Sequence, residues 1–186
     1  MLTCRATSAD DTRRLGERLG RLLGPGDVVG LMGDLGAGKT VFVQGMALGL
    51  DTRGRVTSPT FTIIHEHPGK VPMYHIDVYR LEALSEEDVI GLEEYLYGKG
   101  VAAVEWADKI PGLLPEERLD VEIRRPGVSS GSGGEENPGD SIDDSVREVL
   151  FVPHGARFER VVEELKALAC PGDRHVQFYG RSGTCN

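Results

Sequence analysis

Short apolar runs separated by amphipathic stretches occupy most of the chain, and they predict a fold of alternating strands and helices. Residues 28–32 and 101–104 are apolar runs, which are typical of strands buried on both faces. Residues 119–124 alternate between apolar and polar side chains, and residues 148–152 are expected to form a strand beside them. The pattern therefore favours an α/β protein with a sheet at its centre.

Two further strands are expected at 61–66 and 73–79, joined by a hairpin turn at Pro68-Gly69-Lys70. Pro59 cannot donate a hydrogen bond to a neighbouring strand, so the residues just before this pair are expected to form a loop or a sheet edge. Short antiparallel strands are therefore expected to flank a parallel core.

A stripe of leucines predicts a helix near the N-terminus. Its members, Leu15, Leu19, Leu22 and Leu23, recur at the spacing that places them on one helix face. Ser8 precedes two acidic residues, which is typical of a helix start. We expect the leucines to pack on the sheet. Further helices are expected at 40–50, from Ser85 onward, and at 157–169.

Residues 33–40 read Gly-Asp-Leu-Gly-Ala-Gly-Lys-Thr, which is the G-x-x-x-x-G-K-[ST] pattern of a phosphate-binding loop. An apolar strand precedes the loop and a helix follows it, as the motif requires. Lys39 is then expected to reach the β and γ phosphates, and the Thr40 hydroxyl to hold Mg²⁺. The nucleotide is expected to contact Asp34, Leu35, Gly36, Ala37, Gly38, Lys39, Thr40 and Val41.

Two acidic residues follow apolar strands and are candidates for the chemistry. Glu105 comes directly after the run at 101–104, and a strand beside the phosphate loop would aim this carboxylate at the metal. Asp77 is expected on the same face of its strand as His75 and Tyr79. Spacing alone leaves open whether that face meets a nucleotide. His75 itself is favoured as a structural or hydrogen-bonding residue over a ligand.

Two more positions carry open alternatives. Thr60 lies past the helix that follows the phosphate loop, where nucleotide switches supply a hydroxyl near the γ-phosphate; an ordinary Ser-Pro turn fits the same residues. Trp106, the only tryptophan, either stacks on a base or packs against the protein, and packing is favoured.

Composition narrows the function classes. The 186 residues carry a net charge of −9, so a surface that grips RNA as a whole is not expected. No apolar run approaches the ~18 residues that a membrane helix needs. The three scattered cysteines form no C-x-x-C pair. A cytoplasmic protein that does not bind membranes, and whose partners hold any nucleic acid, is expected.

One domain is expected over residues 1–169. Residues 126–147 form an insertion rich in Gly, Ser and acidic residues, which we expect to be a flexible loop between two strands. The polar tail, 170–186, is expected to be disordered.

Four segments together resemble the TsaE family, the small ATPase needed to make threonylcarbamoyladenosine in bacterial tRNA. They are residues 33–40, 56–61, 75–81 and 104–109, and their order also matches the family. The resemblance implies a P-loop NTPase fold, a three-layer α/β sandwich with a mixed, mainly parallel central sheet.

The resemblance also implies a site. ATP would lie on the loop with Lys39 at its phosphates, while Thr40 and Glu105 support Mg²⁺. Asp77 would be the water-orienting or catalytic acid, so the residues implied in catalysis are Asp77, Lys39 and Glu105. Thr60 would lie in the switch-like loop, and Trp106 close to the nucleotide.

The family works with TsaB and TsaD, and TsaD performs the threonylcarbamoyl transfer to tRNA. ATP hydrolysis by the family is expected to support turnover of that assembly, so the tRNA would be reached only through the TsaB–TsaD heterodimer. One departure is Val41, where the family often has a second threonine; nucleotide affinity is therefore open.

Two other functions share the phosphate loop. A small-molecule kinase would need an acceptor pocket and usually a mobile lid, and no arginine-rich lid segment is evident. A GTP-dependent switch would need an Asn/Thr-Lys-x-Asp element to read the base, which residues 107–110 do not supply.

Overall fold

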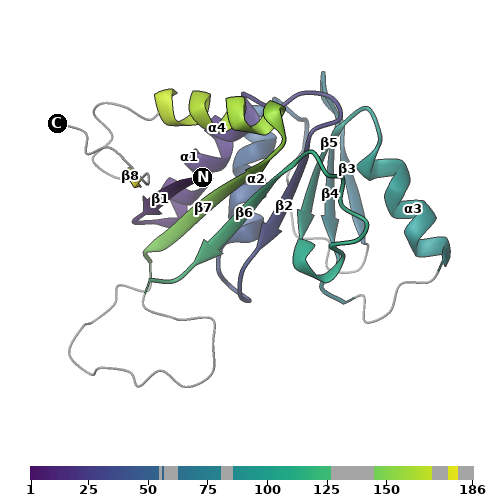
Figure 1. Ribbon diagram of the computed structural model, residues 1–186, viewed down its shortest axis with the longest axis horizontal. Helices are drawn as coiled ribbons and strands as arrows, with labels where there is room; N and C mark the ends of the chain where they lie inside the picture. The colour runs from purple at the N-terminus through teal and green to yellow at the C-terminus, as the bar shows by residue number, and fades with distance from the viewer. Residues whose placement is uncertain (55, 57–62, 81–85, 127–144, 169–175, 180–186) are drawn as a thin grey trace.

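A single eight-stranded sheet organises the molecule (Figure 1). The structure, a computed structural model, describes residues 1–54, 56, 63–80, 86–126, 145–168 and 176–179. The strand order is β3-β4-β5-β2-β6-β7-β1-β8. The strands are β1 (Leu2–Ala6), β2 (Val28–Met32), β3 (Ile64–His67), β4 (Met73–Asp77), β5 (Val101–Glu105), β6 (Arg118–Arg124), β7 (Arg147–His154) and β8 (Val176–Tyr179).

The centre of the sheet is parallel and its flanks are antiparallel. β2 pairs in parallel with β5 and with β6, and β4 pairs in parallel with β5. The four remaining pairings, β3–β4, β6–β7, β7–β1 and β1–β8, are antiparallel. The sheet is mixed, as expected, but its parallel part is confined to β4, β5, β2 and β6, so antiparallel pairings outnumber parallel ones where a mainly parallel sheet was expected.

Helices cover both faces of this sheet. They are α1 (Ala9–Gly20), α2 (Lys39–Gly49), α3 (Glu86–Leu96), the short 3₁₀ helix η1 (Ala107–Lys109) and α4 (Ala156–Leu168). Neighbouring residues of one central strand belong to two separate cores: Val28 packs in a cluster with Leu92 of α3, and Val29 packs with Phe42 of α2. Because successive side chains of a strand point to opposite faces, the molecule has three layers.

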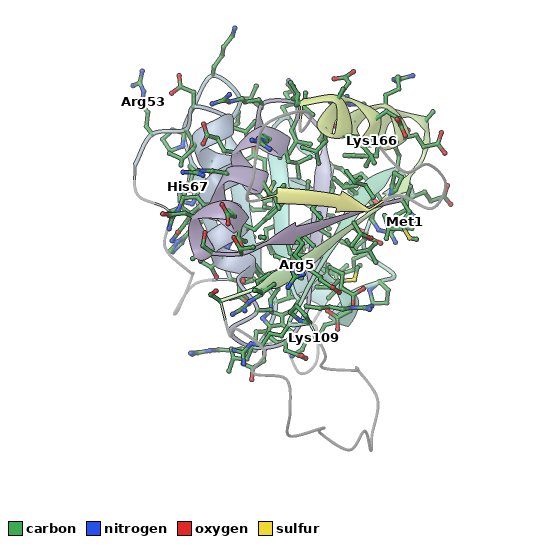
Figure 2. The ribbon with its side chains drawn as sticks, turned by 90° about the vertical axis from the view of Figure 1, so that its left-hand side faces the viewer. Met1, Arg5, Arg53, His67, Lys109 and Lys166 are labelled. Atoms are coloured by element: carbon green, nitrogen blue, oxygen red, sulfur yellow. The ribbon has the colours of Figure 1, made fainter. Side chains whose placement is uncertain are left out.

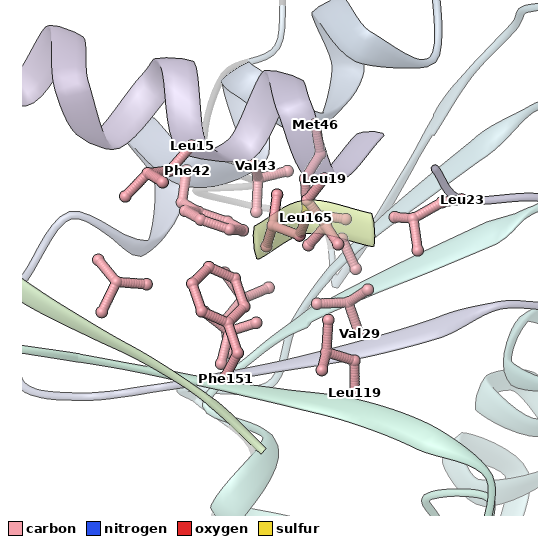
Figure 3. Packing of buried hydrophobic residues seen from close by; sticks show 14 of the residues in the cluster. Leu15, Leu19, Leu23, Val29, Phe42, Val43, Met46, Leu119, Phe151 and Leu165 are labelled. Atoms are coloured by element: carbon pink, nitrogen blue, oxygen red, sulfur yellow. The ribbon is translucent and has the colours of Figure 1, made fainter. Parts of the chain in front are cut away.

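The larger core lies between the sheet and the layer formed by α1, α2 and α4 (Figure 3). At its centre the rings of Phe42 and Phe151 are tilted by 50° with their centroids 6.0 Å apart. Leu15 and Leu19 of the predicted leucine stripe are fully buried here. Leu22 and Leu23 lie beyond the end of α1 at Gly20, although both still pack against this core.

The start of α1 is the one predicted from the sequence. The Ser8 side chain accepts a hydrogen bond from the backbone N–H of Asp11. The Asp11 carboxylate accepts in turn from the backbone N–H and the hydroxyl of Thr7. The Ser8 cap satisfies a backbone donor of the first helical turn, and the Asp11 carboxylate ties the preceding residue Thr7 to the helix start.

Two strands were missed from the sequence. The first, β1, alternates apolar and polar residues over only five positions, and it pairs with β7 and β8 on either side. The second, β8, corrects the expectation of a disordered tail at residues 176–179, which pair with β1 as an added edge strand. Pairing between distant segments places both strands in the sheet.

Helices α1 and α2 contact each other through glycines. Each helix carries two glycines four residues apart, at 16 and 20 in α1 and at 45 and 49 in α2. A Cβ added to Gly16 would lie 2.1 Å from the carbonyl oxygen of Phe42, and one added to Gly45 would lie 2.0 Å from that of Arg13. The two backbones therefore touch directly, which leaves no room for a methyl group.

We predict that Gly45→Ala lowers the free energy of unfolding by about 1–3 kcal/mol, because the new methyl group must push the two helices apart. Urea denaturation followed by circular dichroism measures the change. Gly91→Ala in α3 is the control, since nothing lies within 4 Å of a Cβ at that position. There the better helix propensity of alanine should stabilise the protein by roughly 0.5–1 kcal/mol. Equal effects from the two substitutions would contradict the close helix contact.

Candidate active site

The phosphate loop joins the carboxyl end of β2 to the start of α2, at the edge of the sheet where the parallel strands end (Figure 1). Gly38 is the N-cap of α2 and has φ +111°, a conformation that side chains disfavour. Gly33 has φ +130°, and a Cβ there would lie 2.2 Å from the carbonyl oxygen of Ile123. Glycine at these two positions permits the loop to turn tightly against β6.

Lys39 is almost fully buried, with 4% of its surface exposed. Its Nζ donates to the carbonyl oxygens of Gly33 at 2.5 Å and Asp34 at 2.9 Å. The same nitrogen lies 3.5 Å from the centroid of the Trp106 ring, a favourable position for a cation over an aromatic face. The lysine is thus held at the mouth of the loop by two carbonyl groups and one ring.

Burial lowers the pKa of Lys39, while the charges of nearby carboxylates oppose that change. These acids are, in decreasing order of effect, Glu105, Asp77, Asp108 and Asp34. Lys39 thus faces several acidic groups, and their excess negative charge favours the binding of a further cation at this site.

Glu105 ends β5 and is buried beside the loop. Its two carboxylate oxygens lie 2.9 Å and 3.1 Å from the Thr40 hydroxyl oxygen, which donates to them. The Nε2 atom of His75 lies 2.8 Å from Oε1 of the same carboxylate. A hydroxyl and a carboxylate in contact are hard oxygen ligands of the kind that Mg²⁺ binds, so this pair fits the metal role expected of it.

Asp77 lies beside Glu105 at the end of the neighbouring parallel strand. The two residues are register partners in the β4–β5 ladder, so their side chains leave the same edge of the sheet. Asp77 Oδ1 accepts a hydrogen bond from the backbone N–H of Tyr79 at 3.0 Å, and the side chain is half-buried. The structure therefore brings together Asp77, Glu105 and Lys39, the three residues that the family resemblance implied in catalysis; their catalytic roles stay predictions.

Trp106 adopts a left-handed backbone conformation, with φ +63°, which is unfavourable for a bulky residue. Its backbone N–H donates to the carbonyl oxygen of Leu31 in β2 at 2.9 Å. The ring packs against that of Tyr79, with the centroids 4.7 Å apart, and Lys109 Nζ lies 4.7 Å from the Tyr79 ring centroid. Backbone strain of this kind gathers at functional sites, and here it aims the indole at Lys39.

A cavity of about 270 Å³ lies on the other side of the loop. It is lined by Ala9, Thr12, Gly36, Ala37, Gly38, Val41, Ser145 and Arg147. Arg147 Nε donates to the carbonyl oxygen of Ala37 at 2.9 Å, which ties the first residue of β7 to the phosphate loop. The exposed tip of the loop, formed by Asp34 and Leu35, lies outside this cavity lining.

Sequence reasoning found the loop and its acidic neighbours, because each belongs to a local motif. It missed Thr12, Ser145 and Arg147, which come from distant segments and carry no motif of their own. Thr60, predicted in a switch-like loop, lies outside the described residues. Val41 lines the cavity.

A glycine-rich loop between a central parallel strand and its helix, within a three-layer α/β sandwich, defines the P-loop NTPase fold. The family model of TsaE, described as threonylcarbamoyl adenosine biosynthesis protein TsaE, matches residues 6–130. The chain belongs to the TsaE family.

Individual relatives agree with this assignment. The tRNA threonylcarbamoyladenosine biosynthesis protein TsaE of Bacillus subtilis is 43% identical over 165 residues, covering 88% of this chain and 93% of the relative. The protein of the same name from Treponema pallidum is 46% identical over 123 residues, covering 66% and 91%. The crystal structure of Bacillus subtilis YdiB superposes with a TM-score of 0.72 at 38% identity, covering 91% of this chain and 97% of YdiB.

Among the described residues, no helix combines the length and the apolar character needed to cross a membrane.

His67, on the edge strand β3, is buried next to His75, with ring centroids 6.3 Å apart (Figure 2 labels His67). Its Nε2 has no hydrogen-bond partner among the described residues. Burial, followed by the charges of His75 and His65, lowers the pKa of His67 below its ordinary value of 6.5.

We predict that the protein loses stability as the pH falls below about 6.5, since the unfolded chain then takes up a proton that folded His67 resists. The loss is complete once the pH has passed the lowered pKa of the folded state. His67→Gln should flatten this part of the profile. Melting temperatures of both proteins, measured between pH 8 and pH 5, test it. A constant difference between them at every pH would show that His67 contributes packing alone.

Proposed function

We propose that this chain is a Mg²⁺-dependent ATPase that supports threonylcarbamoyladenosine modification of tRNA together with TsaB and TsaD. The observation that carries the proposal is the contact between Thr40 and Glu105, next to buried Lys39 and within reach of Asp77 at the adjacent strand end. These are the phosphate, metal and acid groups that nucleotide hydrolysis requires.

ATP would lie along the phosphate loop with its base and ribose toward the cavity. A volume of about 270 Å³ is just under the usual range for a whole ligand site. It therefore suits one end of a nucleotide whose phosphates lie outside, over the start of α2. The partial positive charge of that helix start favours the phosphates.

Lys39 would leave the carbonyl oxygens of Gly33 and Asp34 and bind the phosphates in their place. Trp106, already 3.5 Å from the lysine nitrogen, would form one wall of the phosphate site. Thr40 and Glu105 would hold Mg²⁺, which when bound neutralises phosphate charge. Asp77 would orient the attacking water or accept its proton.

Hydrolysis would serve the turnover of a complex rather than the threonylcarbamoyl transfer itself. The net charge of −9 argues against direct capture of tRNA by this chain, so TsaB and TsaD would hold the tRNA substrate. Relatives named for tRNA threonylcarbamoyladenosine biosynthesis support this pathway. The cytoplasm, where tRNA is modified, would be its compartment, and residues 1–169 would act as one ATPase domain interrupted by the segment at 126–147.

We predict that Lys39→Ala weakens ATP binding by roughly 10- to 100-fold, because a hydrogen bond to a charged phosphate is lost. Isothermal titration calorimetry with the purified chain measures the affinity. Lys70→Ala is the matched control: this lysine is exposed in the turn between β3 and β4 and should leave binding unchanged. Equal affinities for the Lys39 and Lys70 variants would remove the phosphate role.

We predict that Asp77→Asn keeps ATP affinity within about threefold but slows phosphate release by roughly 100-fold or more, because the amide cannot accept a proton. The chain is mixed with TsaB, TsaD, unmodified tRNA, ATP and an activated threonylcarbamoyl donor, and both phosphate and modified adenosine are measured over many turnovers. The parent should sustain modification while the variant stalls. Unchanged phosphate release by the variant would assign the hydrolytic role to another group. If tRNA modification proceeded equally well without the parent chain, the proposed function would be overturned.

A further inference from the structure

The buried histidine of β4 is bonded to the carboxylate that the proposed function assigns to the metal. His75 is fully buried, and its Nε2 lies 2.8 Å from Glu105 Oε1. An ionised carboxylate only accepts hydrogen bonds, so Nε2 carries the proton and donates it. Glu105 thereby receives two donors from two elements, the imidazole of β4 and the Thr40 hydroxyl of α2.

Packing alone does not account for an imidazole at this position. The other ring nitrogen, Nδ1, is buried and has no hydrogen-bond partner among the described residues. An unsatisfied buried polar atom costs about 1–3 kcal/mol, and an apolar side chain would avoid that cost. The bond to Glu105 is therefore what the histidine contributes that leucine or methionine does not.

The sheet register explains how the ring reaches Glu105. His75 faces Ala103 directly across the parallel ladder, and Asp77 faces Glu105. Because Ala103 ends at a methyl group, the imidazole has room to extend along β5 toward the next residue on the same face. The carboxylates of Asp77 and Glu105 are neighbours in the same ladder, so their like charges tend to separate. The imidazole donor opposes that separation on the Glu105 side.

We propose that His75 is a positioning residue for the metal site: its Nε2–H fixes the Glu105 carboxylate beside the Thr40 hydroxyl, so that the two groups are placed where they would hold Mg²⁺. This rests on the proposed function, in which Thr40 and Glu105 are the protein's metal ligands. Partners that orient a metal ligand typically contribute 10- to 100-fold in metal affinity. His75 is fully buried, so it would act through the Glu105 carboxylate rather than by contact with the nucleotide.

The test compares ADP affinity in Mg²⁺ with ADP affinity in EDTA, by calorimetry on the full chain. The ratio of the two reports the metal contribution without any turnover. His75→Leu removes the donor and should lower the ratio by roughly tenfold, while affinity in EDTA, which depends on the phosphate loop, stays at the parental value. His65→Leu on β3 is the matched control and should keep the parental ratio.

Two amide variants separate positioning from folding. The amide nitrogen of His75→Gln reaches the place of Nε2, so this variant should retain the ratio within about threefold. The amide of His75→Asn corresponds to Nδ1 and falls short of Glu105, so the ratio should drop as it does for leucine. The two amide variants test the positioning role even if the leucine variant does not fold. Both place an amide where the buried ring was, and they differ in whether that amide reaches Glu105.

The positioning role would be overturned if the leucine and asparagine variants kept the parental ratio of ADP affinity in Mg²⁺ to that in EDTA. It would also be overturned if this ratio fell equally in the glutamine and asparagine variants. If the parent chain bound ADP equally well in Mg²⁺ and in EDTA, both the metal role of Glu105 and the role of His75 would be overturned. The parent measurement thus reports on the proposed function, and the comparison among variants reports on His75.

Discussion

The buried carboxylate of Glu105 is the interaction on which the site depends. It connects three elements that are far apart in the sequence: β5, which carries it, α2 through Thr40, and β4 through His75. A buried carboxylate requires donors, and the two available here come from the phosphate-loop helix and from the strand that also carries Asp77. The two hydrogen bonds to Glu105 therefore hold the phosphate loop, the candidate metal ligands and the candidate catalytic acid at fixed distances from one another.

The charge balance around Lys39 follows from the same geometry. The lysine is buried and faces Glu105, Asp77, Asp108 and Asp34, and its hydrogen bonds go to backbone carbonyl oxygens. Under the proposed function, a triphosphate entering this site would add negative charge to the acidic groups that surround buried Lys39. Such an arrangement disfavours a bare triphosphate and favours one accompanied by a divalent cation. The excess of acidic groups around Lys39 is thus the physical reason for expecting a metal requirement.

The parts of this site that could be predicted from the sequence are those encoded locally. The loop at 33–40, the strand ending at Glu105 and the capped start of α1 each depend on neighbouring residues, and the structure has them where the sequence placed them. The pairing of β1 with β7 and β8, and the bond from Arg147 to Ala37, join residues more than 100 positions apart. The local pattern of each segment can predict a strand, but it does not show which distant segment that strand pairs with. The same limit applies to His75: the sequence shows a histidine at this position, but it does not show which carboxylate the histidine contacts.

The glycine contact between α1 and α2 affects the proposed nucleotide site as well as the stability of the fold. α2 begins at Lys39, so whatever fixes this helix also fixes Lys39 and Thr40. α1 meets α2 backbone to backbone, and this leaves little freedom for the helices to slide. The same close approach brings Thr12 of α1 to the cavity, with its methyl carbon 3.7 Å from a Cβ built at Gly38. One interface thus backs the phosphate loop and supplies a wall of the pocket beside it, which is why small residues are needed on helix faces far from any catalytic group.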